Sequence, residues 1–251
     1  MKKIIAKNFS LSADDYKKFA TIQKFSAEQL AKLVGKISGM VLDIGAGRGE
    51  LAKFFDNYIG VDISPRMCEL ARKDGVGKVL CCDAEDIPFD NGIFDCIVSN
   101  FALQWMNPDK VFKEAGRVLR TGGLFGFSIP VEGSLEELFL AWQKAFLKHR
   151  GFIDVLFKFP SVNSVFYSLY RKNFDVKQIK IDRYTDFKDT PSQALKSITG
   201  IGARNPYRHR SLYPGKEFYR FFKKEFQDKK TRKYPVTYQV LTVLAIKRQS
   251  F

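Results

Sequence analysis

Histidine and paired cysteine are scarce in this sequence. It contains two histidines, His149 and His209, and four cysteines, none of them in a C-x-x-C arrangement. So few imidazoles and so little thiol clustering disfavour a metal site, and we expect no bound metal. Most of the cysteines fall in or beside predicted strands, so they are interpreted as reduced core thiols of a cytosolic protein rather than as disulfides.

Long apolar runs are also missing. No segment approaches the roughly 20 apolar residues that cross a bilayer, and Ile4-Ile5-Ala6, which follows the basic start, is too short for a secretory signal. These absences predict a cytoplasmic protein with no membrane-spanning or secretory segment. A chain of 251 residues can bury the core of one α/β domain, so we expect a single domain and a monomer.

Acidic residues are depleted in the second half only. Residues 1–133 carry 18 Lys and Arg against 17 Asp and Glu, whereas residues 134–251 carry 24 against 10. A generally lysine-rich composition would raise both halves together. The asymmetry therefore indicates an acidic macromolecular partner for the second half, whether nucleic acid, membrane or acidic protein.

A strand-turn-helix pattern organises the first half. The apolar run Met40–Ile44 is typical of a buried parallel strand, and it contains one carboxylate, Asp43. Three glycines follow, Gly45, Gly47 and Gly49, and they let the backbone turn sharply and approach a ligand closely. The residues from Glu50 to Phe55 are predicted to begin a helix.

The glycine spacing distinguishes between two kinds of nucleoside ligand. A dinucleotide-binding turn, G-x-G-x-x-G, requires a glycine at position 50, where this chain has Glu50. A carboxylate there would also lie where the pyrophosphate rests. The observed pattern, D-x-G-x-G-x-G, instead carries Asp43, which suits a ligand with an ammonium group and no phosphate. S-adenosylmethionine fits that description.

Two further acids follow predicted strands. The strand that begins at Tyr58 ends in Asp62-Ile63, and a carboxylate there can accept hydrogen bonds from both hydroxyls of a ribose. The strand Lys78–Cys82 ends in Asp83-Ala84, at the edge where open α/β sheets bind ligands. Asp83 can accept from an adenine amino group while the N–H of Ala84 addresses the ring; the alternative is a solvated loop acid.

The fourth predicted strand, Phe94–Asn100, leads into an apolar and aromatic loop where the transferred group would emerge. Gln104 is the polar exception in this loop. Trp105 is interpreted either as a core residue or as a wall of the methyl-transfer pocket.

Residues 1–37 are predicted to form lid helices. Caps at Ser12 and Ser26 predict two helices with a break near Phe25. Folded over the cofactor, this lid would bring Tyr16 and Gln23 against it, although amphipathic packing alone explains the apolar residues nearby.

The second half contains a long basic connection. After a fifth strand at 124–129, the sequence predicts helices at 135–148 and 161–171, a half-exposed strand at 174–182 and a closing strand at 236–246. The connection between the last two strands, with helical pieces near 191–199 and 215–227, is unusually long, so we assign substrate and partner recognition to it. The predicted parts are a lid at 1–37, a cofactor core at 38–130 and a basic recognition half at 131–251.

The stretch from the glycine turn through Asp62 and Asp83-Ala84 to Ser99-Asn100 resembles the class I S-adenosylmethionine-dependent methyltransferases. Further stretches extend the likeness across nearly the whole chain and resemble the malonyl-acyl carrier protein O-methyltransferases of biotin synthesis. They are Phe9–Gln23, Ser99–Trp105, Gly133–Trp142, Leu195–Ala203 and Tyr234–Tyr238. The resemblance implies a Rossmann-like α/β fold, with a seven-stranded, mostly parallel sheet, an antiparallel last strand and a helical insertion before it.

The resemblance also implies a reaction and a partner. A methyl group would pass from S-adenosylmethionine to the free carboxylate of a malonyl thioester on acyl carrier protein, leaving S-adenosylhomocysteine and a malonyl methyl ester that primes pimeloyl and biotin synthesis. Acyl carrier proteins are acidic, which agrees with the basic half. The expected cofactor-binding residues are Tyr16, Gln23, Asp43, Gly45, Gly47, Gly49, Asp62, Ile63, Asp83, Ala84 and Asn100.

No acid-base residue is required for this chemistry, because a malonyl carboxylate is already ionised at pH 7. Tyr16 and Trp105 are the expected walls of the substrate pocket, and Arg204 is expected to orient the carboxylate.

Two segments depart from the family pattern. Arg204–His209 and Lys229–Lys233 are more basic than expected there, and RNA would suit them too. Two alternatives therefore stay open: a methyltransferase of RNA or of a small metabolite, and a non-catalytic binding module that kept the fold. The intact acids and glycines argue against the binding module.

Overall fold

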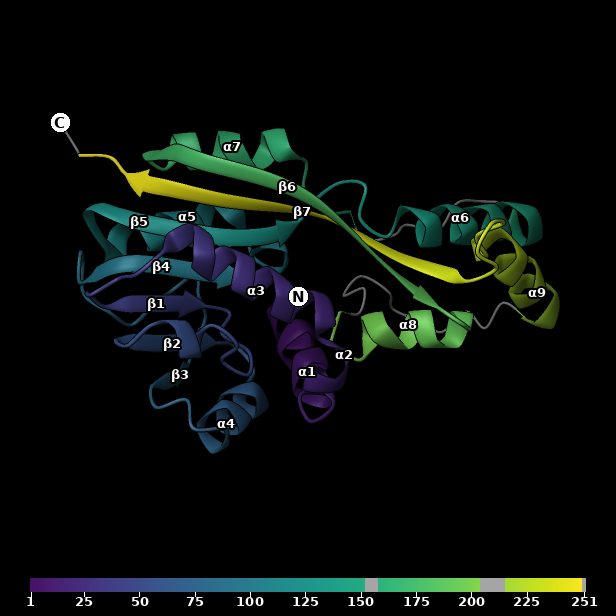
Figure 1. The fold of residues 1–251 in the computed structure, drawn as a ribbon, viewed down its shortest axis with the longest axis horizontal. Coiled ribbons are helices and arrows are strands. Elements are labelled where there is room, and N and C mark those ends of the chain that lie inside the picture. Colours follow the sequence, from purple (N-terminus) through teal and green to yellow (C-terminus); the bar gives the residue numbers. More distant parts are fainter. Residues whose placement is uncertain (152–157, 204–214, 250–251) are drawn as a thin grey trace.

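A seven-stranded sheet forms the centre of the protein, in the order β3-β2-β1-β4-β5-β7-β6 (Figure 1). The computed structural model describes residues 1–151, 158–203 and 215–249. Strands β1 to β5 pair in parallel, whereas β7 is antiparallel to both β5 and β6. This order confirms the predicted fold class. The strands are β1 (Val41–Ile44), β2 (Tyr58–Asp62), β3 (Val79–Cys81), β4 (Phe94–Asn100), β5 (Leu119–Pro130), β6 (Phe174–Lys188) and β7 (Tyr234–Lys247).

Helices bury both faces of the central strands. Along β4, Cys96 and Val98 belong to the core beneath α3 (Thr21–Val34), while Ile97 between them belongs to the core beneath α5 (Pro108–Val118) and α7 (Val162–Arg171). A strand covered on both sides is apolar throughout, which explains the continuous apolar runs in the sequence. Helix α4 (Pro65–Lys73) begins after Ser64, whose side chain accepts from the Met67 N–H.

Strands β6 and β7 extend past the ends of the other five strands, and a second group of helices packs against their outer ends (Figure 1). The group consists of α6 (Glu136–Arg150), α8 (Pro191–Thr199) and α9 (Gly215–Phe226). Its separate core is built mainly from aromatic residues of α6 and α9, including Phe146, Phe218 and Phe222. We call these three helices with the outer ends of β6 and β7 the cap. The helical insertion predicted before the closing strand is therefore α8 and α9.

The helix predicted at Glu50–Phe55 is wrong. The chain forms a turn there and then one 3₁₀ turn, η1 (Ala52–Phe54), before Phe55 returns to extended backbone. The connection from Ile44 to Tyr58 must carry the chain across the sheet to a parallel neighbour, and it is close to the minimum length for such a crossover. The turn at 45–51 occupies about half of this connection, so only a single helical turn follows it.

The predicted lid helices are also placed incorrectly. The chain forms α1 (Lys2–Ser12), α2 (Tyr16–Phe19) and then α3, which runs without a break through Phe25 and Ser26. Ser26 does not cap a helix, because its hydroxyl donates to Ser128 Oγ on β5 at 2.8 Å. The interruption falls instead at Ala20, whose ψ of 37° lies outside the helical range.

Several predicted boundaries shift by a few residues. Helix α5 ends at Val118, and β5 already begins at Leu119, five residues before the predicted start of the fifth strand at 124. Strand β6 continues six residues past the predicted Asp182, to Lys188. Within the described residues, no helix combines the length and apolar character needed to cross a membrane.

Candidate cofactor and acceptor site

A cavity lies at the carboxyl ends of β1, β2 and β4, and we call it the first cavity. The glycine turn after β1, the end of β2 and the loops after β3 and β4 form its walls, and Lys2, Ile5 and Phe9 of α1 close one side. Parallel sheets bind ligands at this edge, where the loops that follow neighbouring strands diverge.

The glycine turn and Asp62 are joined by hydrogen bonds. The N–H of Gly47 donates to Asp62 Oδ2 at 2.9 Å, and the N–H of Ser64 donates to Asp62 Oδ1 at 2.8 Å. Gly45 has a φ of 71°, and a Cβ there would lie 2.2 Å from the Ala102 Cβ, so no other residue fits. These contacts fix the carboxylate of Asp62 in the wall of the first cavity, where each oxygen keeps a lone pair for a ligand hydroxyl.

Asp43 is buried beneath the turn and is 2% exposed. Its Oδ2 accepts from the Tyr58 hydroxyl at 2.7 Å, while its Oδ1 has no hydrogen-bond partner among the described residues. Burial raises the pKa of Asp43 to about 7, and the charges of Glu50 and Asp62 act in the same direction. A cationic ligand at the turn would stabilise the ionised form, so the electrostatics of the turn suit an ammonium or sulfonium group.

Asp83 is held by the first helix. Lys2 Nζ contacts Asp83 Oδ2 at 2.5 Å and Glu85 Oε2 at 2.6 Å, and all three residues line the first cavity. The Ala84 backbone lines the same wall. Helix α1 is therefore attached by an ion pair to the loop that was predicted to bind adenine.

Asn100 connects the lid helices to the sheet. Its Nδ2 donates to the carbonyl of Gln23 at 2.9 Å, and its Oδ1 accepts from the Ser128 hydroxyl at 2.5 Å. Because Ser26 also donates to Ser128, α3 is fixed to the ends of both β4 and β5. Asn100 can thus shape the first cavity through α3 as well as by its own position in the wall.

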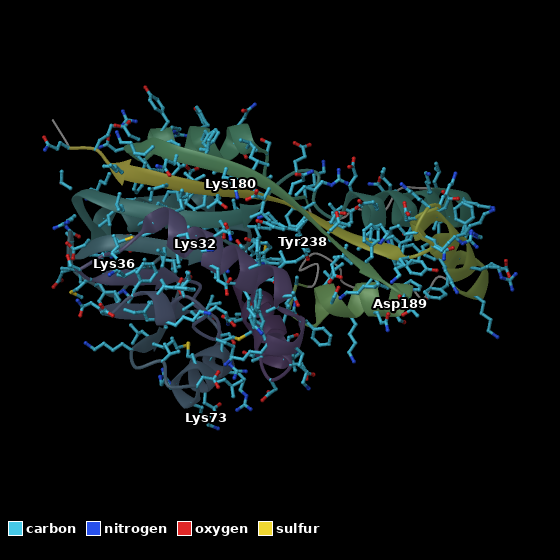
Figure 2. The ribbon with its side chains drawn as sticks, viewed as in Figure 1. Lys32, Lys36, Lys73, Lys180, Asp189 and Tyr238 are labelled. Atoms are coloured by element: carbon cyan, nitrogen blue, oxygen red, sulfur yellow. The ribbon has the colours of Figure 1, made fainter. Side chains whose placement is uncertain are left out.

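A second cavity lies between the lid helices and the cap. Its described lining is apolar or aromatic apart from four uncharged polar side chains, those of Tyr16, Gln23, Gln104 and Tyr238. Tyr238 lies on β7 where the strand passes from the sheet into the cap (Figure 2). The Gln104 Nε2 donates to the Phe101 carbonyl at 2.8 Å, which leaves its Oε1 buried without a partner among the described residues.

The two cavities meet at four shared wall residues, Phe9, Tyr16, Phe101 and Trp105. Phe9 and Trp105 pack edge to face with ring centroids 5.8 Å apart. Burial raises the pKa of Tyr16 well above its ordinary value, so its phenol stays protonated and acts as a hydrogen-bond donor. A group bound in one cavity would thus face a group bound in the other across an aromatic junction.

The predicted site residues separate into groups. Those that line the first cavity are Tyr16, Gly45, Gly47, Asp62, Ile63, Asp83, Ala84 and Asn100, and Trp105 lines both cavities. Gln23 lines the second cavity, Asp43 lies beneath the turn, and Gly49 faces a separate surface hollow beside Arg48 and Lys17. Arg204 lies outside the described residues.

Some residues of the site were not predicted individually. The sequence shows Lys2 only as part of a basic chain start and does not indicate its ion pair with Asp83. It places Tyr58 in a strand and does not indicate the hydrogen bond of its hydroxyl to Asp43. Phe9 could be found only through the resemblance, because a single aromatic residue on a helix is otherwise indistinguishable from core packing. Within the part of the chain that the structure describes, no group of His, Cys, Asp and Glu could hold a metal ion.

Comparison with known proteins agrees with this geometry. A family model described as a methyltransferase domain matches residues 42–127. The chain is 32% identical over 213 residues to a malonyl-[acyl-carrier protein] O-methyltransferase of Geobacter sulfurreducens, covering 78% of this chain and 79% of that protein. A protein of the same name from Alcanivorax borkumensis is 26% identical, covering 98% of this chain and 87% of its own. A solved geranyl diphosphate methyltransferase in complex with S-adenosylmethionine has the same fold, with a TM-score of 0.54 at 17% identity, covering 89% and 85% of the two chains.

The fold and the first cavity define a class I S-adenosylmethionine-dependent methyltransferase. Within this class, the chain belongs to the family of malonyl-[acyl-carrier protein] O-methyltransferases, since the likeness to the Geobacter protein spans more than two thirds of both chains. The predicted family and the predicted cofactor are confirmed.

Proposed function

We propose that this enzyme transfers the methyl group of S-adenosylmethionine to the free carboxylate of a malonyl thioester carried by acyl carrier protein. The observation that supports this choice most directly is the second cavity, whose described lining includes no charged side chain. An amine or hydroxyl acceptor requires a base to remove its proton, whereas a carboxylate is already ionised at neutral pH. The product would be a malonyl methyl ester, the primer of pimeloyl and biotin synthesis.

The residues of the first cavity suit the cofactor. Asp62 would accept from the ribose hydroxyls, Asp83 and the Ala84 N–H would address the adenine, and Asp43 would stabilise the positive end of the ligand through the glycine turn. S-adenosylmethionine supplies the transferable methyl group on its sulfonium. With the nucleoside fixed at this edge, that group would lie toward the aromatic junction of Phe101 and Trp105.

The second cavity would accelerate the reaction by position and by exclusion of water. Tyr16 and Trp105 restrict the acceptor to the line between the two cavities, and such orientation can supply roughly 7–11 kcal/mol. Removing water from around the carboxylate makes it a stronger nucleophile. The hydroxyls of Tyr16 and Tyr238 can donate to one carboxylate oxygen and leave the other to attack.

Arg204 remains a prediction for orientation of the carboxylate. It directly follows Ala203, which lines the second cavity. A guanidinium at that end of the cavity would bind the malonyl carboxylate and reject the uncharged acetyl thioester. Acyl carrier protein would be met in the cytoplasm, and the enzyme would act on it as a monomer.

Transfer of labelled methyl groups tests the proposal. S-adenosylmethionine with a labelled methyl is incubated with malonyl-acyl carrier protein, and acetyl-acyl carrier protein and bulk RNA are run beside it, with an Asp62→Ala variant as background. We expect base-labile label on the malonyl species alone, and none with Asp62→Ala. Label on RNA, or its absence from the malonyl thioester, would leave the fold and cofactor standing and contradict the proposed acceptor.

A further inference from the structure

Helix α9 and the turn after it carry a concentration of positive charge. Residues 215–233 include eight Lys and Arg against three Asp and Glu. Arg220 is neutralised by Glu217, and Lys233 pairs with Asp189. Lys223 and Lys224 are exposed, and neither forms an ion pair with a described residue. Two adjacent cations on one helix are thus left for a partner.

An exposed aromatic side chain lies on the same side of α9 as Lys223, one helical turn before it. Tyr219 of α9 is 44% exposed. Helices α6 and α9 pack against each other along the cap (Figure 1). Tyrosine is enriched at protein interfaces, so Tyr219 beside unpaired cations suits an acidic protein surface, whereas a nucleic-acid backbone would bind by charge alone.

Helix α6 connects this surface to the acceptor cavity. Its first turns provide Leu138 and Phe139 to the lining of the second cavity, and seven residues further on Phe146 packs against Phe218 of α9. At 1.5 Å per residue, these positions are only about 10 Å apart along the axis. A prosthetic arm of roughly a dozen bonds, each about 1.5 Å long, can span that distance.

We propose that the exposed side of α9, formed by Tyr219, Lys223 and Lys224, is where acyl carrier protein docks. The inference rests on the proposed function and adds the site of the partner. An acidic helix of the carrier would lie against the two lysines, an apolar residue of that helix would cover Tyr219, and the arm of the carrier would enter the second cavity beside Phe139. Charge complementarity of this kind speeds encounter and fixes orientation.

Charge reversal with a matched control tests the surface. Lys223→Glu with Lys224→Glu is compared with Lys110→Glu and Lys113→Glu, two exposed lysines of α5 on the main body of the protein. Binding of fluorescently labelled acyl carrier protein is measured by anisotropy at low and high salt. Affinity for S-adenosylmethionine and circular dichroism establish that each variant is folded, and Lys223→Gln with Lys224→Gln provides a milder change.

We expect the α9 reversal to weaken carrier binding at least tenfold at low salt and the α5 reversal at most twofold. The difference in affinity between the two variants should shrink as salt screens the charges. In the α9 variant, kcat/KM for the malonyl carrier should fall because KM rises, with kcat unchanged. Equal binding by both variants overturns the docking surface, as does a wild-type enzyme that binds RNA through these lysines and leaves the carrier unbound. If wild-type enzyme binds the carrier without forming the ester, the proposed function fails while the binding comparison still decides the surface.

Discussion

At the residue scale, Asp43 and Tyr58 form a buried pair directly beneath the glycine turn, where burial disfavours the ionised form of Asp43. Asp43 has one satisfied oxygen and one without a described partner, and Glu50 and Asp62 add negative charge nearby. Ionisation of Asp43 therefore opposes folding in the absence of ligand. A bound cation would relieve this, so the same carboxylate that destabilises the free protein favours the cofactor.

The pH dependence of stability follows from this pair. The pKa of Asp43 is raised from its ordinary value to about 7, so the folded state binds a proton that the unfolded state releases between about pH 4 and pH 7. The contribution of Asp43 to stability is thus lost as the pH rises through that window. We expect Asp43→Asn to match the wild type near pH 4 and to exceed it above pH 7, by at most about 4 kcal/mol.

Thermal unfolding of the cofactor-free proteins from pH 4 to pH 8.5 measures this difference. Asp56→Asn changes an exposed carboxylate close by in the sequence and should give no such trend. A gap between wild type and Asp43→Asn that does not change with pH would show that Asp43 titrates normally.

At the scale of single elements, helix α1 is held over the first cavity by few contacts. Lys2 bridges Asp83 and Glu85, and Ser10 and Ser64 share a hydrogen bond of 2.8 Å at the other end of the helix. Arg66 of α4 also pairs with Asp14, just beyond α1. Phe9 packs on Trp105 between these ends, outside the cores of the sheet, so α1 can open without disrupting those cores, and we propose that it is the part of the lid that admits the cofactor.

Removing the Lys2 contact should speed both entry and exit of the cofactor. Lys2 is partly exposed, and such ion pairs are each worth about 0.2–1 kcal/mol. We expect Lys2→Met to raise the association and dissociation rates of S-adenosylmethionine by roughly two- to fivefold at low salt, with little change in Kd. Stopped-flow fluorescence of Trp105, which lines the first cavity, provides the measurement.

Lys3→Met is the matched control, because Lys3 is exposed and forms no ion pair with a described residue. Rates that are the same in both variants would mean that α1 does not gate the cavity through Lys2.

At the scale of the whole molecule, the protein has a body that forms the first cavity and a cap that helps to line the second, and the two have separate cores. The cap core is mainly aromatic: Trp142 packs edge to face on Phe218 and Phe222, with centroids 5.2 and 5.5 Å away. Cofactor residues belong to the body, while the cap lines the second cavity through α6 and α8. Damage to the cap should therefore affect the acceptor and spare the cofactor.

Phe222→Ala tests this separation. Phe222 is fully buried in the cap core, and truncating a buried Phe costs about 3–5 kcal/mol. We expect a large loss of thermal stability and of methyl transfer to malonyl-acyl carrier protein, while affinity for S-adenosylmethionine stays within about twofold of wild type. Denaturation monitored by circular dichroism, and cofactor binding by calorimetry, measure the two effects.

Tyr167→Ala on α7 removes an exposed aromatic residue instead and should cost under about 1 kcal/mol. A parallel loss of cofactor affinity in Phe222→Ala would show that body and cap fold as one unit.

The sequence by itself determined the body of this protein. Buried parallel strands are apolar on both faces, so β1, β2 and β4 are visible as runs, and the residue at each carboxyl end, such as Asp62 or Asp83, is placed at the ligand edge by strand direction alone. The charge asymmetry likewise needs no structure, because it depends only on counting residues.

Tertiary structure decided the rest, because it depends on contacts between residues far apart in the chain. Ser26 has the appearance of a helix cap but donates to Ser128, 102 residues away, so α3 continues through the predicted break. Lys2 meets Asp83 only when α1 folds over the sheet, and the acceptor cavity exists only where Phe9, Trp105 and Tyr238 converge. Local propensity contains no information about such partners.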